Sequence, residues 1–131
     1  RQSSENPVYY VQYAHARIRS IYKQVSEQGI AVPPLAETDL SPLREPEELA
    51  TIKRLLQYPE IVKGAARALE PHRVGYFLQE LAGAFHPYYK NHRVIQDDRR
   101  LMFARLALCA AVGRVVKNGL ALLGVSAPES M

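Results

Sequence analysis

Apolar residues recur every three or four positions along most of the chain, a spacing that places them on one face of an α-helix. The first such stretch opens on Asn6 and Pro7, a good N-cap followed by a residue whose fixed φ suits the first helical position. The pattern predicts a helix from Pro7 to about Gln28, which Gly29 ends. Its apolar stripe consists of Val11, Ala14, Ile18, Ile21, Tyr22 and Val25.

The next stretch, IAVPPLAETDLSPLREPEE, contains four prolines and no helical spacing before Pro46, so residues 30–45 are predicted to form a connecting loop. From Pro46 the pattern predicts a short helix that ends at about Tyr58. Pro59 is then expected to restart the chain into a second short helix that ends near Glu70. The apolar side of the first short helix would consist of Leu49, Ile52, Leu55 and Leu56.

Pro71 opens another predicted helix, which runs to about Tyr89 and is followed by the loop KNHRVIQ. Asp97 or Asp98 is then expected to cap a last helix, DRRLMFARLALCAAVGRVVKNGLALL. Gly124 should end that helix in a Schellman-type cap. The buried stripe of the helix after Pro71 would consist of Val74, Phe77, Leu78, Leu81 and Phe85.

The last helix has no charged face between Arg105 and Arg114, so its middle should be buried on most sides by other helices. At about 1.5 Å per residue it would be roughly 39 Å long. No alternating strand pattern of useful length occurs elsewhere. The sequence therefore predicts an all-α fold, a bundle of about five helices around a long, largely buried C-terminal helix, with residues 1–131 forming a single helical domain.

Composition is consistent with a globular domain that has a hydrophobic core, since 47% of the 131 residues are hydrophobic. The single cysteine, Cys109, lies in the apolar run LALCAAV and is expected to be buried, which excludes a disulfide framework and suits a reducing cytoplasm. That run is far shorter than the ~20 residues that cross a membrane. Because the chain begins at Arg1 without an initiator methionine, we expect a fragment of a longer protein.

The net charge of +4 comes entirely from the second half of the chain. Residues 1–70 contain nine Lys and Arg against nine Asp and Glu, whereas residues 71–131 contain eight against four. A basic surface in that half would attract an acidic partner such as RNA or DNA, although many enzymes have a similar charge.

Tyr10, Tyr13 and Arg17 are spaced three and four apart on the first predicted helix, and we call these residues the tyrosine row. The centre of the row lies roughly 90° around the helix from the apolar stripe, so its rings should be half buried. Tyrosine is common at such borders because its ring is apolar and its tip is polar. A stacking surface for unpaired RNA bases, with a cation beside it, is the functional alternative.

A second aromatic group, Tyr88 and Tyr89, occurs in the segment FHPYYKNHR. Rings interleaved with basic groups suit single-stranded nucleic acid, and they equally suit a bundle corner with a solvated charged rim. We take Tyr89, Lys90 and Arg93 as candidate RNA-binding residues. The basic neighbours of the pair are Lys90, His92, Arg93, Arg99 and Arg100.

No catalytic or metal-binding set can be assembled from the motifs. His86 and His92 lack the spaced cysteines, histidines or carboxylates that would complete a metal site, and Cys109 lies in a predicted core. Asp97 and Asp98 are better explained as capping residues than as a catalytic pair. The glycines are dispersed and no nucleophile elbow occurs, so this chain by itself should catalyse nothing and need no metal or cofactor.

Two long motifs, NPVYYVQYAHARI and KNGLALLGVSAPESM, resemble the C-terminal region of bacterial-type arginyl-tRNA synthetases. The segments DRRLMFARLALC and FHPYY fit between them, so the resemblance extends from Asn6 to Met131. In that family an all-helical anticodon-binding domain of the DALR type closes the polypeptide on a methionine. The literal Asp-Ala-Leu-Arg string is absent here, and Ser130 stands where a basic residue is usual.

The resemblance implies that the tyrosine row faces the anticodon loop of the tRNA for arginine. Tyr10 and Tyr13 would contact splayed bases, and Arg17 a backbone phosphate. Tyr89 would supply a further stacking surface. The extended segment SAPESM would lie against the same loop and present backbone groups and the terminal carboxylate of Met131.

The resemblance also implies a full-length enzyme of class I that joins arginine to its tRNA. ATP and Mg²⁺ would bind to a catalytic domain that is absent from this sequence, and that domain would be a partner of the same chain. The parent is expected to be cytoplasmic and monomeric, without a membrane association. Two alternatives remain open at this point: the anticodon domain of another class I synthetase, and a helical protein-interaction module whose tyrosine row docks a partner helix.

Overall fold

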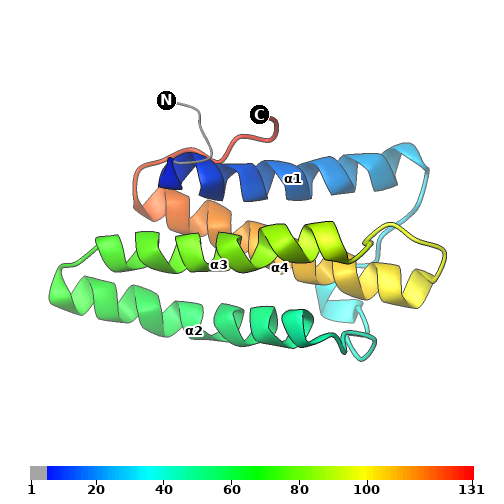
Figure 1. The fold of residues 1–131 in the computed structure, drawn as a ribbon, viewed down its shortest axis with the longest axis horizontal. Helices are drawn as coiled ribbons and strands as arrows, with labels where there is room; N and C mark the ends of the chain where they lie inside the picture. Colours follow the sequence, from blue (N-terminus) through cyan, green and yellow to red (C-terminus); the bar gives the residue numbers. More distant parts are fainter. Residues whose placement is uncertain (1–5) are drawn as a thin grey trace.

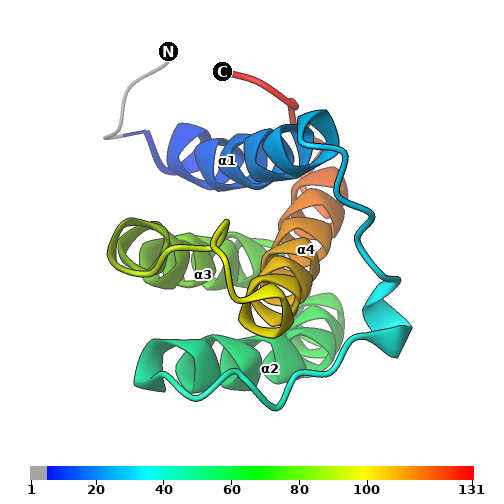
Figure 2. The ribbon, with the colours of Figure 1, turned by 90° about the vertical axis from the view of Figure 1, so that its right-hand side faces the viewer.

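The computed structural model describes residues 6–131, and every regular element in that range is helical. The elements are α1 (Pro7–Glu27), the short 3-10 helix η1 (Leu35–Glu37), α2 (Pro46–Ala68), α3 (His72–Asn91) and α4 (Arg99–Leu122). Figures 1 and 2 show α1, α3 and α2 stacked in that order, with α4 packed along one side of the stack and in contact with all three. The all-α prediction is confirmed.

The predicted helix count was wrong, because the two short helices expected on either side of Pro59 are one continuous helix, α2. A proline inside a helix removes one backbone hydrogen bond and crowds the preceding turn. Pro59 is exposed, so water can hydrate a carbonyl that loses its partner on that side of the helix. The described chain therefore has four α-helices instead of five.

The predicted inner face of α2 was also partly wrong. Leu49 and Leu56 are 53% and 75% exposed, while the buried residues of α2 include Glu48 and Thr51. The spacing of apolar residues could not show how α2 is rotated about its own axis, because the residue that faces the interior, Glu48, is charged. Ile52 and Leu55 are partly buried against the core, as predicted.

Glu48 is fully buried and forms the centre of a polar network. Its Oε2 accepts hydrogen bonds from the Tyr88 hydroxyl at 2.6 Å and from Arg105 Nε at 2.8 Å. Its Oε1 accepts from the Glu45 amide at 3.0 Å, which is half of a capping box. Arg105 also donates to the Arg93 carbonyl at 2.9 Å, so the network joins α2, α3, α4 and the loop between α3 and α4.

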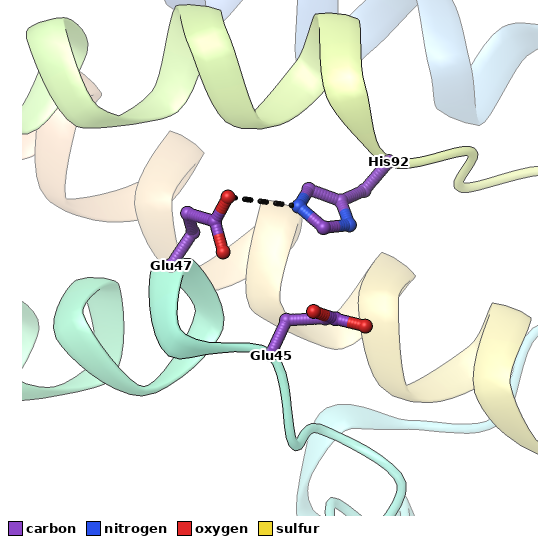
Figure 3. A group of neighbouring side chains, drawn as sticks. All are labelled: Glu45, Glu47 and His92. Atoms are coloured by element: carbon purple, nitrogen blue, oxygen red, sulfur yellow. Dashed lines mark hydrogen bonds and ion pairs between the residues drawn. The ribbon is translucent and has the colours of Figure 1, made fainter.

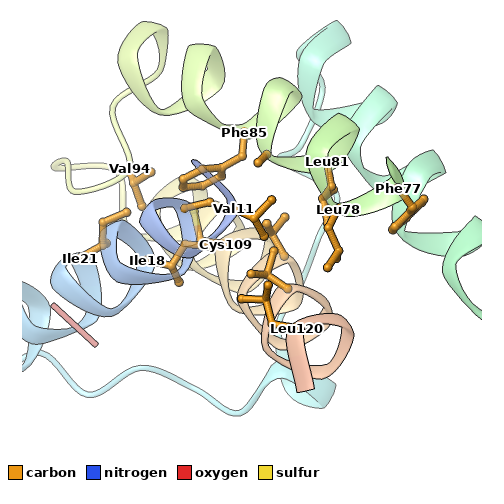
Figure 4. Close-up of a cluster of buried hydrophobic side chains, with 14 of the residues drawn as sticks. Val11, Ile18, Ile21, Phe77, Leu78, Leu81, Phe85, Val94, Cys109 and Leu120 are labelled. Atoms are coloured by element: carbon orange, nitrogen blue, oxygen red, sulfur yellow. The ribbon is translucent and has the colours of Figure 1, made fainter. Parts of the chain in front are cut away.

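The hydrophobic core lies where α1 and α3 pack against α4 (Figure 4). The predicted stripe of α3 is entirely buried, and that of α1 is buried except for Tyr22, which is partly exposed. Cys109 is buried as predicted, and burial raises the pKa of its thiol to about 12. Close contact requires glycine on α4, because a Cβ at Gly119 would lie 2.8 Å from the Leu78 side chain.

The predicted loop 30–45 wraps around the α4 side of the bundle and contains η1. Its Leu43 is buried in a second apolar cluster with Tyr88, Ala104 and Leu108. Asp39 forms an ion pair of 2.6 Å with Arg100.

Within residues 6–131, no helix combines the length and the apolar character needed to cross a membrane.

The predicted cap of α4 is confirmed: Gly124 has a φ of 74°, and the Val125 amide donates to the Leu120 carbonyl at 2.8 Å. Helix α2 ends in the same way, with the Glu70 amide donating to the Ala65 carbonyl at 2.8 Å. Here, however, the left-handed position is occupied by Leu69, with a φ of 56°. A side chain in that conformation is strained, and Leu69 is 87% exposed, so its packing offers little compensation.

We predict that Glu48→Gln lowers the free energy of unfolding by about 3 kcal/mol, because Arg105 would keep a buried charge without its counter-ion. Urea unfolding at neutral pH would measure the loss. Glu47→Gln is the matched control: Glu47 is the exposed neighbour on α2, and removing its ion pair with His92 should destabilise the chain much less than Glu48→Gln does. Similar losses in both variants would contradict a stabilising role for the buried pair.

We predict that Leu69→Gly raises the free energy of unfolding by about 0.5 to 1 kcal/mol, because glycine adopts a positive φ without steric strain. The same substitution at Leu56, which is 75% exposed within α2, should instead lower it by about 1 kcal/mol. Denaturant midpoints of the two variants should therefore move in opposite directions. A decrease in both would show that the αL strain at Leu69 is not significant.

Candidate nucleic-acid interface

The tyrosine row lies along the first half of α1, which begins where the Asn6 side chain accepts hydrogen bonds from the Val8 and Tyr9 amides. All members of the row are half-buried, as its position at the edge of the apolar stripe predicts. The structure adds Tyr9, whose ring is parallel to that of Tyr13 with centroids 6.2 Å apart. The exposed parts of these rings form an aromatic surface on α1.

Arg17 connects the two aromatic groups that the sequence suggested separately. The central carbon of its guanidinium lies 4.6 Å from the centroid of the Tyr13 ring and 4.5 Å from that of the Tyr89 ring. We call Tyr13, Arg17 and Tyr89 the arginine sandwich. Cation–π attraction to both rings holds the cation where α1 and α3 meet. A stacking surface and a positive charge are thus combined in one place.

His86 of α3 lies directly behind the arginine sandwich and is buried, with 7% of its surface exposed. Arg17 Nη1 donates to His86 Nδ1 at 2.9 Å, and His86 Nε2 donates to the Tyr10 carbonyl at 3.1 Å. A guanidinium has only donors, so these two bonds assign a neutral ring with its proton on Nε2. Burial, and secondarily the positive charges of Arg17 and Lys90, lower the pKa of His86 despite an opposing effect of its bond to Tyr10.

From the sequence, His86 was considered only as a metal ligand and rejected as one, and it was not predicted to lie at this interface. The spacing held the necessary information, because His86 precedes Tyr89 by three residues and therefore lies on the same side of α3. What the spacing could not show is that this side of α3 faces α1.

The pair Tyr88 and Tyr89 is divided between core and surface. Tyr88 is 2% exposed and belongs to the Glu48 network, whereas Tyr89 is partly exposed. Tyr89, Lys90 and Arg93 line a shallow surface hollow of about 480 Å³ between the end of α3 and the second half of α1. These three candidate residues are therefore brought together, next to the arginine sandwich.

The C-terminal segment 124–131, which we call the tail, is hydrogen-bonded to α1. Gln12 Nε2 donates to the Ser126 carbonyl at 2.9 Å, and His15 Nδ1 donates to the Pro128 carbonyl at 3.0 Å. Gln12 and His15 lie on the opposite flank of α1 from Arg17, so the tail approaches the helix from the other side (Figure 1). Met131, which is 44% exposed, ends this tail.

A larger groove of about 820 Å³ lies on that same far flank, between α1, α4 and the loop 30–45. Its floor includes Ile18 and Ala107, and its lining includes the basic residues Arg19, Arg114 and Lys117. None of the residues predicted to bind RNA lines this groove.

Glu45, Glu47 and His92 form a group whose potential ligand atoms all lie within 4.8 Å of one another (Figure 3). Glu47 Oε2 and His92 Nε2 are 3.2 Å apart, and this hydrogen bond lowers the pKa of the Glu47 carboxyl. Both glutamates are exposed, and exposed acidic groups commonly cluster without an ion. The group is explained by a surface ion pair between α2 and the end of α3.

Comparison with known proteins identifies relatives over the whole chain. The model of the DALR anticodon binding domain family matches residues 11–131. The chain is 54% identical over 131 residues to an arginine–tRNA ligase of Geobacter metallireducens and 55% identical over 131 residues to one of Syntrophotalea carbinolica. These matches include all of this chain but 23% and 24% of the two relatives, so the chain spans about a quarter of their length.

A solved structure of Thermus thermophilus arginyl-tRNA synthetase has the same fold in the matched region. It aligns with a TM-score of 0.79 at 34% sequence identity, covering 98% of this chain and 22% of that one.

We predict that titration of His86 makes the folded chain less stable as the pH falls from 7 to 5. Because the pKa of His86 in the folded protein is lower than the ordinary value for histidine, about 6.5, the unfolded chain binds more protons in this range. The contribution of His86 to the free energy of unfolding is therefore present above about pH 6.5. It is lost as the pH falls towards the lowered pKa of His86 in the folded protein.

Chemical unfolding at several pH values would measure this dependence, which should be weaker in His86→Asn. His72→Asn, at an exposed position of the same helix, provides the matched control. An unchanged pH dependence in His86→Asn would show that His86 does not contribute to it.

Proposed function

The chain belongs to the DALR anticodon-binding domain family, and from this premise we propose that it binds the anticodon loop of the tRNA for arginine. We further propose that residues 1–131 form one domain of a longer arginine–tRNA ligase. The observation that carries the RNA-binding proposal is the arginine sandwich, in which Arg17 is held between two partly exposed tyrosine rings. Single-stranded RNA presents the matching chemistry, unstacked bases beside phosphates.

In the proposed complex, bases that are splayed out of the anticodon loop stack on Tyr10, Tyr13 and Tyr89. The guanidinium of Arg17 donates hydrogen bonds to a backbone phosphate between those bases. Lys90 and Arg93 border the hollow beside Tyr89, where they neutralise neighbouring phosphates. The exposure of both side chains supports this role, since each can reach a ligand outside the bundle.

The tail supplies hydrogen-bond acceptors in this proposal. Every arginine codon has G in the middle, so every matching anticodon has C there, with an N4 amino donor. A backbone carbonyl or the terminal carboxylate of Met131 would accept from that donor and reject uracil, whose O4 is itself an acceptor. A buried contact of this kind discriminates by about 1 to 3 kcal/mol. The bonds from Gln12 and His15 support the proposal because they restrain the tail on α1.

The reaction of the parent enzyme, in this proposal, joins arginine to its tRNA with ATP in the presence of Mg²⁺. The catalytic domain of the same chain would hold those ligands, and the described residues would select the tRNA. We propose a cytoplasmic, monomeric parent. The support is the similarity to arginine–tRNA ligases along all of this chain.

We predict that the chain binds an anticodon stem-loop with C in the middle position more tightly than the same stem-loop with U, and more tightly at low salt than at high salt. Tyr89→Ala should weaken binding to the C form by about 1 to 3 kcal/mol through loss of base stacking. Fluorescence anisotropy with labelled stem-loops at two salt concentrations would measure both effects.

Tyr76→Ala is the matched control, because Tyr76 is a 63% exposed tyrosine on α3 outside the arginine sandwich. It should bind like the wild type. If neither stem-loop binds, the assay is repeated with the full-length ligase. Loss of C-over-U preference there as well would contradict the proposed function and favour a protein-docking role for the tyrosine row.

A further inference from the structure

We propose that His86 is a positioning residue, which fixes the orientation of the Arg17 guanidinium within the arginine sandwich so that its free edge meets a phosphate of the RNA. This inference rests on the proposed function and deepens it. It assigns a role to a buried side chain that does not itself touch the ligand.

Stacking alone leaves the guanidinium with freedom to turn. The rings of Tyr13 and Tyr89, with centroids 4.6 and 4.5 Å from the central carbon, keep the cation close to both of them. They do not determine the direction of its individual N–H groups, because a ring face has no preferred direction for them. A hydrogen bond at the edge of the cation does, and the 2.9 Å bond from Nη1 to His86 Nδ1 is such a bond.

The His86 ring is itself held so that it can act as a fixed acceptor. Its Nε2 donates to the Tyr10 carbonyl at 3.1 Å, which leaves the lone pair of Nδ1 for Arg17. The ring centroid lies 4.5 Å from that of Tyr10 and 5.5 Å from that of Tyr13, the latter in a stacked arrangement. Because His86 is also buried, it has little freedom to follow Arg17 if the latter moves.

Arg17 keeps most of its hydrogen-bonding capacity for a ligand. A guanidinium has five N–H donors, and among residues 6–131 His86 is the one hydrogen-bond partner that this side chain has. No carboxylate within the same range forms an ion pair with Arg17. A half-exposed cation that is oriented by a neutral acceptor retains its full charge for an anion.

The energetic benefit is preorganisation. Ordering a long side chain on binding costs about 0.5 to 1.5 kcal/mol, which corresponds to roughly two- to tenfold in affinity. If His86 orders Arg17 in the free protein, this cost is removed from the binding step. A purely structural histidine would stabilise the fold without such an effect on the RNA affinity.

The test compares two substitutions at position 86 in this chain. His86→Leu retains an apolar side chain of similar size but has no acceptor, whereas His86→Asn places an amide oxygen near the position of Nδ1. We expect His86→Leu to weaken binding of the C-containing stem-loop roughly two- to tenfold, and His86→Asn to restore much of the lost affinity. In an Arg17→Ala background, His86→Leu should cause no further loss.

A second measurement does not require RNA. NMR of the Arg17 guanidinium in the free protein should show restricted rotation in the wild type and in His86→Asn, and faster rotation in His86→Leu. Thermal unfolding of each variant establishes that it is folded. Tyr76→Ala again serves as the control, with unchanged Arg17 signals.

The outcomes separate this inference from the proposed function. If His86→Leu leaves the Arg17 rotation unchanged, or weakens RNA binding equally with and without Arg17, the positioning role is overturned. If Arg17 loses its restricted rotation in His86→Leu but Arg17→Ala binds RNA like the wild type, then His86 positions Arg17 and the proposed phosphate contact fails.

Discussion

A carboxylate that is buried must find its counter-charge and its hydrogen-bond donors inside the protein, and the Glu48 side chain imposes this constraint on the whole bundle. Burial by itself would raise the pKa of Glu48, but hydrogen bonds from Tyr88, from the Glu45 amide and from Arg105 outweigh it and lower the pKa. The requirement for these donors sets the rotation of α2, the position of the end of α3 and the depth of Arg105 on α4.

This buried network also determines which residues of α3 reach the surface. Successive helical residues differ by about 100°, so the bond that holds Tyr88 towards Glu48 leaves Tyr89 facing a different neighbour. That neighbour is α1, where Arg17 completes the arginine sandwich. The bond from Arg105 to the Arg93 carbonyl extends the same restraint to the loop that borders the hollow beside Tyr89. The core and the candidate interface are therefore coupled through a few hydrogen bonds.

The buried Glu48 network and the partly exposed arginine sandwich differ in whether their charges are compensated within the protein. Glu48 and Arg105 neutralise each other inside the bundle, and Tyr88 and the Glu45 amide donate further hydrogen bonds to the Glu48 carboxylate. Arg17, by contrast, is oriented by an uncharged histidine and by two aromatic rings. A charge that is compensated in the folded state contributes to stability, whereas a charge that is oriented but not compensated remains available to an anionic ligand.

Local sequence determined the class of the fold, most helix boundaries and the buried stripes of α1 and α3. It also determined the caps of α1 and α4 and the burial of Cys109. These features depend on short-range periodicity and on the conformations of individual residues. Local sequence also identified the tyrosine row and the family resemblance. Tertiary structure alone decided that α2 continues through Pro59, that Leu49 and Leu56 face outward, and that His86 joins Tyr89 at Arg17. The reason is that each of these depends on where the other helices lie. Pro59 is tolerated because water can reach that side of α2, and Glu48 is buried because Arg105 of α4 meets it there. Arg17 and His86, which are 69 positions apart, can share a hydrogen bond only after α1 and α3 have packed together.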